Sequence, residues 1–264
     1  MTSNSGQRVR LDFGNLPLVE VALRVSFESP VDLKFAIINR VGERLHSQFP
    51  LLTEPTSFER PPGIRGASVA FGPGQIPGAI YSGNPDGLII ALQSQVVVAR
   101  WLKHVGKNGG DYPRFPVLRD ALRQAMEAFK DACGGQLPRV VVVNISYVNF
   151  LRIAHTEPVL RRYFSDLARV KATQNADQIH RLEVSWREPD SVDLRYRLEQ
   201  VTAEVEGQTV EGYQLTTAAG TRLAEGADAD SALETVHDRL QLFFQDLISD
   251  HARKEWELKE VPLG

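Results

Sequence analysis

The sequence predicts an α+β protein in which two consecutive segments repeat one order of elements. Residues 17–135 are predicted to form a strand, a helix, several strands and a second helix, and residues 136–264 repeat that order. Apolar residues at every second position indicate the strands, and apolar residues at helical spacing indicate helices that cover them. We therefore expect two tandem strand–helix–antiparallel strands–helix units that form one curved sheet, with the helices on one side.

Length and composition fit this architecture. The chain has 264 residues, of which 42% are hydrophobic and 24% are charged, as in ordinary soluble domains. Residues 1–16 are predicted to be an N-terminal extension. The boundary between the two units falls at Gly134 to Pro138, which is too short to act as a free linker, so we expect the units to pack as one body.

In the first unit, strands are predicted over residues 18–28 and within 66–104. The opening strand alternates apolar and polar residues, and its apolar side consists of Val19, Val21, Leu23, Val25 and Phe27. Residues 88–92 and 96–101 are predicted to form a hairpin that turns at three polar residues, Gln93 to Gln95.

Helices are predicted over residues 31–49 and 113–132 of the same unit. We expect Asp32 to cap the first helix and Gly134-Gly135 to end the second. The apolar stripe of the first helix contains Phe35, Ile38, Val41 and Leu45, and that of the second contains Leu118, Leu122, Ala125, Met126 and Phe129.

The second unit is predicted to contain a strand over 139–153, a helix over 157–170, strands within 179–222 and a long helix over 229–257. Ser231 and Glu234 have the spacing of a capping box at the start of the long helix. The last helix carries a wider apolar surface than one sheet face needs.

Two candidate binding surfaces follow from the second unit. One contains Arg181, Arg187, Arg195 and Arg197, which alternate with carboxylates on the polar side of two strands. Cross-strand ion pairing is the favoured interpretation, and a surface for phosphate or another anionic ligand is the alternative. The other candidate is a partner-binding surface on the last helix, formed by Phe244, Ile248 and Trp256.

Other chemistry has little support. The single cysteine, Cys133, excludes an internal disulfide and the usual thiolate zinc sites, and the six histidines are scattered. The glycine loop at 72–78 contains Pro73 and Pro77, which lack the N–H groups that a phosphate-binding loop requires. No nucleophile motif occurs, so we expect no catalytic residues, no metal and no cofactor.

Four segments resemble a known family. They are PLVEVALRVSFE from Pro17, DYPRFPVL from Asp111, SYVN from Ser146 and HDRLQLFF from His237. Together they are similar to a sporadically distributed family of uncharacterised bacterial proteins with a PLVE opening strand and a YPRFP-like motif. The resemblance implies a bacterial, cytosolic protein and carries over no catalytic residues.

The expected function is that of a non-enzymatic binding or adaptor protein. By fold analogy, TATA-binding-like and helix-grip-like architectures bind through the free face of their sheet. The formal net charge of −3, a polar start without an apolar leader and the absence of a long apolar run predict a cytoplasmic protein that does not bind membranes. A protein partner and an anionic ligand both remain open. The alternative is a triphosphatase-like enzyme acting on a phosphorylated or nucleotide ligand in the sheet.

Overall fold

The structure, a computed structural model, describes residues 9–13, 17–53, 78–83, 87–103, 112–151, 162–165, 181–189, 191–205 and 208–262. The first part of the segment 66–104, in which strands are predicted, and most of the predicted helix at 157–170 lie outside these residues. In chain order, the described strands are β1 (Val9–Phe13), β2 (Leu18–Phe27), β3 (Leu51–Thr53), β4 (Ala79–Ser82), β5 (Leu88–Leu92), β6 (Val96–Leu102), β7 (Val140–Leu151), β8 (Arg181–Arg187), β9 (Val192–Val205), β10 (Gln208–Arg222) and β11 (Leu258–Pro262). The helices are α1 (Phe35–Leu45), α2 (Phe115–Ala132), α4 (Ala229–Leu247) and α5 (Asp250–Glu255).

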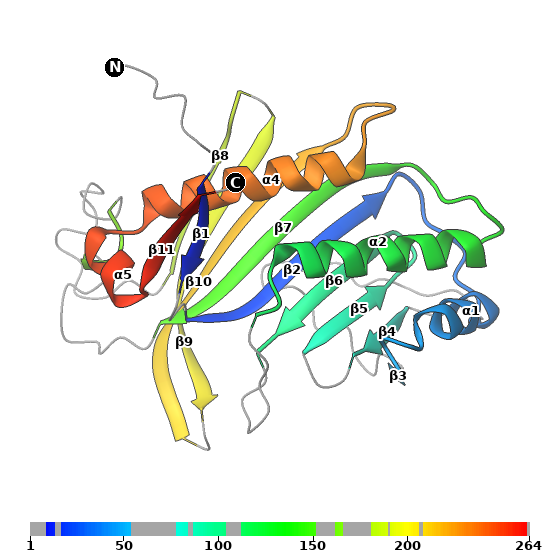
Figure 1. The fold of residues 1–264 in the computed structure, drawn as a ribbon, viewed down its shortest axis with the longest axis horizontal. Helices are drawn as coiled ribbons and strands as arrows, with labels where there is room; N and C mark the ends of the chain where they lie inside the picture. The colour runs from blue at the N-terminus through cyan, green and yellow to red at the C-terminus, as the bar shows by residue number, and fades with distance from the viewer. Residues whose placement is uncertain are drawn as a thin grey trace. The chain divides into compact units, whose positions relative to one another are not determined.

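The described strands form two sheets (Figure 1). Nine of them make one open antiparallel sheet in the order β3-β4-β5-β6-β2-β7-β10-β9-β8. β1 and β11 form a separate antiparallel pair, which the sequence pattern did not predict. The predicted α+β class and antiparallel sheet are therefore confirmed.

The chain divides into two compact units. Unit 1 comprises Met1–Val19, Tyr147–Ala219 and Thr235–Gly264, and unit 2 comprises Glu20–Ser146 and Gly220–Glu234. These units are interleaved along the chain, whereas the sequence divides it consecutively into 17–135 and 136–264. No helix in the described part of the chain is long and apolar enough to cross a membrane.

In unit 2, α1 and α2 cover the same face of the strands. The Tyr81 hydroxyl of β4 donates a 2.8 Å hydrogen bond to the Ile38 carbonyl of α1, and the ring of Phe27 in β2 lies 6.0 Å from that of Phe129 in α2. Directly opposed residues share a face of a sheet. The register therefore places a row of buried residues on that face, namely Tyr81, Ile90, Ala99 and Leu23. Figure 1 shows α2 lying across β5 and β6.

The start of α1 differs from the prediction. Asp32 does not cap the helix, because the helix begins at Phe35 with Lys34 at the N-cap position. The preceding backbone is held elsewhere, since the Val31 N–H donates to the Ser94 carbonyl at 2.7 Å. Phe35 is 58% exposed and is not part of the core stripe, whereas Ile38, Val41 and Leu45 are buried as expected.

The C-terminal end of α2 confirms the prediction. Gly134 and Gly135 have φ values of +80° and +88°, which glycine adopts at little cost. Their N–H groups donate to the carbonyls of Asp131 and Lys130 at 3.1 and 2.9 Å. The last turn of α2 is closed in the manner of a glycine C-cap.

The predicted last helix is two helices. α4 ends at Leu247, Ile248 forms a β-bridge with Phe164, and α5 begins at Asp250. The Ser249 hydroxyl accepts a 3.2 Å hydrogen bond from the Ala252 N–H and so caps the new helix. The sequence predicted one helix because apolar residues keep helical spacing on both sides of this break.

The prediction of a capping box formed by Ser231 and Glu234 at the start of α4 was also wrong. The Asp228 carboxylate accepts hydrogen bonds from the Ser231 N–H at 2.8 Å and from the Ser231 hydroxyl at 2.7 Å. The predicted partner, Glu234, pairs instead with Arg119 of α2. These hydrogen bonds lower the pKa of Asp228, and the bond from the Ser231 hydroxyl has the larger effect.

Asp228→Ala is expected to destabilise the protein by about 1 kcal/mol at neutral pH, because the α4 N-terminus loses its cap. Folding lowers the pKa of Asp228. The stability that this carboxylate adds is therefore fully present above its pKa in the unfolded chain, and it is lost as the pH falls through its pKa in the folded protein. Urea denaturation of the wild type and Asp228→Ala should therefore give free energies of unfolding whose difference becomes smaller from pH 7 to pH 3. Asp246→Ala, an exposed change near the other end of α4, serves as the control. A difference that does not depend on pH would contradict the assignment of the cap.

In unit 1, α4 packs against β8 and β9. The ring of Phe243 lies 4.7 Å from that of Trp186 and 6.1 Å from that of Tyr196. The inward residues of β9 are buried, as the alternation predicted; they are Val192, Leu194, Tyr196 and Leu198. The outward side of these two strands carries the predicted arginines.

Candidate functional site

Carboxylates accompany every arginine of the predicted anion-binding surface. The register places Arg181 opposite Glu199, Glu183 opposite Arg197 and Arg187 opposite Asp193. Arg187 makes two hydrogen bonds to Asp193, at 2.7 and 3.0 Å. Arg181 donates to Glu183 at 2.8 Å, Arg195 lies 3.8 Å from Glu183, and Arg197 pairs with Glu199. The pairs of Arg187 with Asp193 and of Arg195 with Glu183 join the two strands, as the favoured interpretation expects, and the other two pairs each lie within one strand.

These pairs also explain the electrostatics of the surface. The hydrogen bond from Arg181 lowers the pKa of Glu183, and the hydrogen bond to Asp193 raises the pKa of Arg187. The side chains of Arg181, Arg187 and Arg195 are at least half exposed, so each pair contributes little stability. An anionic ligand at this surface has to compete with carboxylates already bound to the guanidinium groups.

The three residues predicted to bind a partner are buried. Phe244 is 8% exposed, Ile248 1% and Trp256 4%. The Phe244 and Trp256 rings are stacked at 6.2 Å, and Trp256 also stacks on Tyr163 at 5.9 Å. The structure brings the aromatic rings together in the interior of unit 1, where a partner does not reach them.

A polar cluster closes this aromatic core. The Tyr163 hydroxyl donates to the Glu255 carboxylate, with oxygen distances of 2.6 and 2.8 Å, and His251 Nε2 lies 3.1 Å from Glu255. Burial and this hydrogen bond raise the pKa of Tyr163 to about 12. The tyrosine therefore stays protonated, and the cluster ties residues 162–165 to α5.

A different cationic site lies on the face of unit 2 that points away from α1 and α2. We call this side the outer face and define it by Glu20, Ala22, Arg24 and Ser26 of β2 and the residues opposite them. Arg100 of β6 is directly opposite Ala22, so it is the diagonal neighbour of both Glu20 and Arg24. Arg100 donates to Glu20 at 2.8 Å, and their side chains are 29% and 24% exposed.

Arg24 has no acceptor of its own. Its side chain is partly buried, and the described part of the chain offers it neither a hydrogen bond nor an ion pair. Burial lowers the pKa of Arg24, and the charge of Glu20 opposes this effect only partly. Arg24 and Arg100 therefore share one nearby carboxylate: Glu20 accepts the hydrogen bond of Arg100, and its charge also acts on the partly buried Arg24 guanidinium.

Apolar side chains continue from Arg24 across the outer face. Arg24 is opposite Val98, Val98 is opposite Ala91, and Ala91 is opposite Ile80. Val98 is 8% exposed, and Ala91 and Ile80 are partly exposed. We call these three residues the apolar row. The row therefore runs from a buried residue beside Arg24 to partly exposed residues farther from it.

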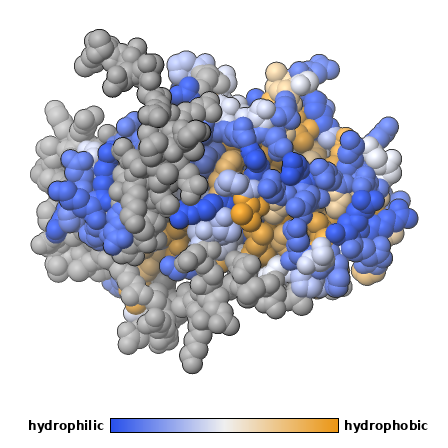
Figure 2. All heavy atoms as spheres, in the orientation of Figure 1, coloured by the Kyte–Doolittle hydropathy of each residue, from blue (hydrophilic) through white to orange (hydrophobic). Residues whose placement is uncertain are grey.

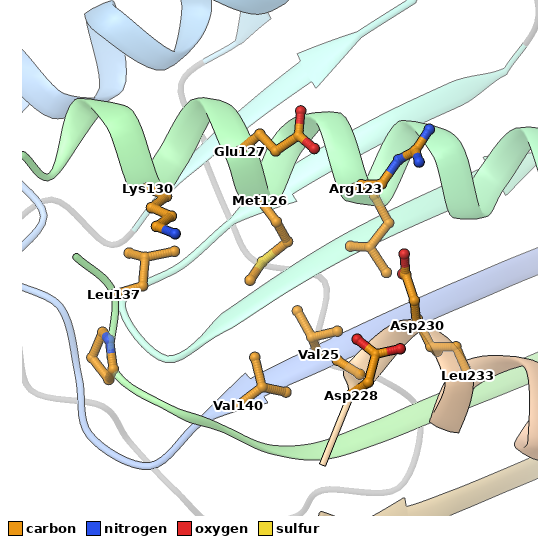
Figure 3. A pocket seen from close by; sticks show the side chains of 13 residues that line it. Val25, Arg123, Met126, Glu127, Lys130, Leu137, Val140, Asp228, Asp230 and Leu233 are labelled. Atoms are coloured by element: carbon orange, nitrogen blue, oxygen red, sulfur yellow. The ribbon is translucent and has the colours of Figure 1, made fainter. Parts of the chain in front are cut away.

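An open groove of about 320 Å³ lies on the opposite side of the same strands (Figure 3). Val25 and Val140 form its floor, and Met126 of α2 points into it. Its rim carries charges of both signs, from Arg123, Glu127, Lys130, Asp228 and Asp230. Three carboxylates accompany two cationic side chains, so the rim has no excess of positive charge that would favour an anion.

Other features of the described surface give no further candidate site. On the face drawn in Figure 2, hydrophobic residues show mainly in the middle, between hydrophilic ones. The exposed large apolar side chains of the described residues come from different elements: Phe35, Leu52, Val117 and Leu242. Among the described residues, no group of three or more His, Cys, Asp or Glu side chains is arranged to hold a metal ion. Burial raises the pKa of the Cys133 thiol, which disfavours the reactive thiolate.

The sequence contains only a weak signal for the Arg24 site. Alternation assigns Glu20 and Arg24 to the polar side of β2, and an arginine there suggests an ordinary solvated pair. The pairing of Glu20 with Arg100 joins residues 80 positions apart and depends on the register of β2 with β6. That register gives the hydrogen bond of Glu20 to Arg100, while Arg24 is affected only by the charge of the same carboxylate.

Comparison with models of known protein families and with curated protein sequences gives no match to this chain.

Proposed function

We propose that this chain is a non-enzymatic binding protein that holds the anionic group of its ligand at Arg24 on the outer face of unit 2. The observation that carries the proposal is the partly buried guanidinium of Arg24, whose nearby carboxylate, Glu20, is hydrogen-bonded to Arg100. A charge that is removed from water without a partner costs folding free energy, and a carboxylate or phosphate recovers that cost on binding. Arginine suits this task, because its planar group donates two parallel hydrogen bonds to such anions.

We also propose that the sheet arose by tandem duplication of one unit. Outward from β2 the strands follow in the order β6, β5, β4, and outward from β7 in the order β10, β9, β8. This matching order supports a tandem duplication about β2 and β7. It is compatible with the TATA-binding-like or helix-grip-like arrangement and with a ligand on a sheet face.

Arg24→Gln is expected to weaken binding of the anionic ligand by about 10- to 100-fold, because it removes a charge-assisted bidentate contact. The same change should leave thermal stability unchanged or raise it, since the protein loses an unpaired, partly desolvated charge. Isothermal titration with inorganic phosphate, ATP, duplex DNA and decanoate at 50 and 200 mM salt, together with thermal unfolding of each variant, tests both effects.

Two control variants test whether the loss of binding is specific to the arginine at position 24. Arg40→Gln removes an exposed arginine of α1, and the triple variant Arg187→Gln, Arg195→Gln, Arg197→Gln removes the paired arginines of β8 and β9. Both should bind as the wild type does. The proposal fails if the wild type binds none of the four anions, or if Arg24→Gln binds them as well as the wild type. Loss of binding in the triple variant alone would favour the β8 and β9 surface.

A further inference from the structure

The groove between α2 and the start of α4 lies on the side of the strands opposite to the outer face. All of its lining residues belong to unit 2. The helix α2 lines it from Leu122 to Lys130, and a rise of about 1.5 Å per residue gives the groove a length of about 12 Å. Met126, Leu137 and Val140 line it and are partly exposed, so a ligand has apolar surface to cover.

Charges of opposite sign face the groove at its two ends (Figure 3). Lys130 points toward the floor at one end, beside Leu137, and the carboxylates of Asp228 and Asp230 lie at the other end. The side chain of Met126 lies between these ends. A ligand that fits the whole groove therefore carries a negative and a positive charge, separated by an apolar segment.

The remaining charges of the rim point away from the floor. Figure 3 shows the side chains of Arg123 and Glu127 directed away from Val25 and Val140. Arg123 lies 3.3 Å from the carboxylate of Asp120, which belongs to the same helix. These side chains therefore do not supply the charge at either end of the groove.

The two end charges are open to a ligand. Lys130 is exposed and Asp230 is partly exposed, and within the described residues neither side chain has a hydrogen bond or an ion pair. Asp228 is partly occupied, because its Oδ2 atom accepts both hydrogen bonds from Ser231. Asp230 is therefore the carboxylate that a cation contacts, and the charge of Asp228 adds to the attraction.

We infer that the groove binds a short apolar peptide of about three residues, whose ammonium group lies at Asp230 and whose carboxylate lies at Lys130. An extended chain spans about 3.4 Å per residue, so three residues reach about 10 Å and match the length of the groove. The apolar side chains of the peptide cover Met126 and Val140. A simple amine or a simple carboxylate fits only one end of the groove.

The test begins with four peptides and the full chain. Isothermal titration should show that alanyl-leucyl-alanine binds at least fivefold more tightly than triglycine, which has the same end charges without the apolar side chains. Acetylation of the peptide's amino end and amidation of its carboxyl end each remove one charge. Each should weaken binding by about three- to fivefold, as expected for exposed ion pairs.

Three variants assign each charge to its end of the groove. Asp230→Asn should weaken binding of the free peptide by about three- to fivefold and leave binding of the acetylated peptide unchanged. Lys130→Gln should do the same for the free peptide and leave the amidated peptide unchanged. Glu127→Gln is the matched control, because this carboxylate lies on the same helix and points away from the groove. It should bind all four peptides as the wild type does.

Several outcomes would overturn the inference. It is wrong if no peptide binds at about 10 mM, if the acetylated and amidated peptides bind as tightly as the free one, or if Asp230→Asn weakens the acetylated peptide equally. Sedimentation of the wild type that shows a dimer, dissociated by Met126→Ser, would assign the groove to a second copy of the chain instead. Arg24→Gln should bind the peptides as the wild type does, so failure here leaves the proposed function of Arg24 standing.

Discussion

Leu240→Asp is expected to abolish the folded state at 25 °C. Leu240 is 1% exposed, in the middle of α4 among Val236, Phe243 and Phe244, which are also buried. An aspartate at this position leaves an ionised carboxylate without a partner in an apolar interior, or forces it to bind a proton. Either cost amounts to several kcal/mol, which is close to the whole free energy of unfolding of a typical domain. Circular dichroism, thermal unfolding and the soluble yield measure the effect.

Leu242→Asp is the matched control for this prediction. Leu242 is two residues further along the same helix and is 53% exposed. The same chemical change there should alter the free energy of unfolding by no more than about 0.5 kcal/mol. A Leu240→Asp protein that melts like the Leu242→Asp protein would show that the buried stripe of α4 is misplaced.

Gly212→Ala is expected to destabilise the protein by about 3 kcal/mol. A Cβ atom at Gly212 would lie 2.5 Å from the Leu151 carbonyl oxygen and 3.0 Å from Cζ of Phe150. The nearer atom belongs to the backbone of β7, which is held in the sheet and cannot rotate away. Overpacking of this kind forces the strands apart or distorts them. The midpoint of urea denaturation gives the loss of stability.

Gly226→Ala separates this steric effect from backbone strain. Gly226 has a φ of +76°, and a Cβ there would meet nothing within 4 Å. Alanine at that position should cost only about 1 kcal/mol, from the left-handed backbone conformation. Equal losses for the two variants would mean that β10 approaches β7 less closely than the structure shows.

The elements that were predicted well are those with a strong local pattern. β2, α2 and β9 bury most of the residues that alternation or helical spacing assigned to their apolar faces, although Val19 and Met126 are only partly buried. The predicted hairpin is formed by β5 and β6. Side chains repeat every two residues in a strand and every 3.6 in a helix, so a segment with one apolar face shows its type without knowledge of its neighbours.

The errors occurred where distant segments compete with the local pattern. Asp32 has the right chemistry for a helix cap, but the Val31 N–H bonds to Ser94, and α1 begins later. Apolar spacing continues from α4 into α5, but Ile248 pairs with Phe164 and the helix is interrupted. Both β1 and β11 need a partner from the other end of the described chain, which no local periodicity reveals.

The sequence by itself determined the α+β class, the alternation of the strands and most of the buried positions, because these follow from side-chain periodicity within one segment. Only the tertiary structure decided which arginines have partners. Arg187 and Arg195 pair across the register of β8 with β9, whereas Arg181 and Arg197 pair with Glu183 and Glu199 of their own strands. The register of β2 with β6 brings Arg100 to Glu20, the carboxylate whose charge also acts on Arg24. Charge pairing depends on distances of a few ångströms between strands that are remote in sequence, so chain order alone does not specify it.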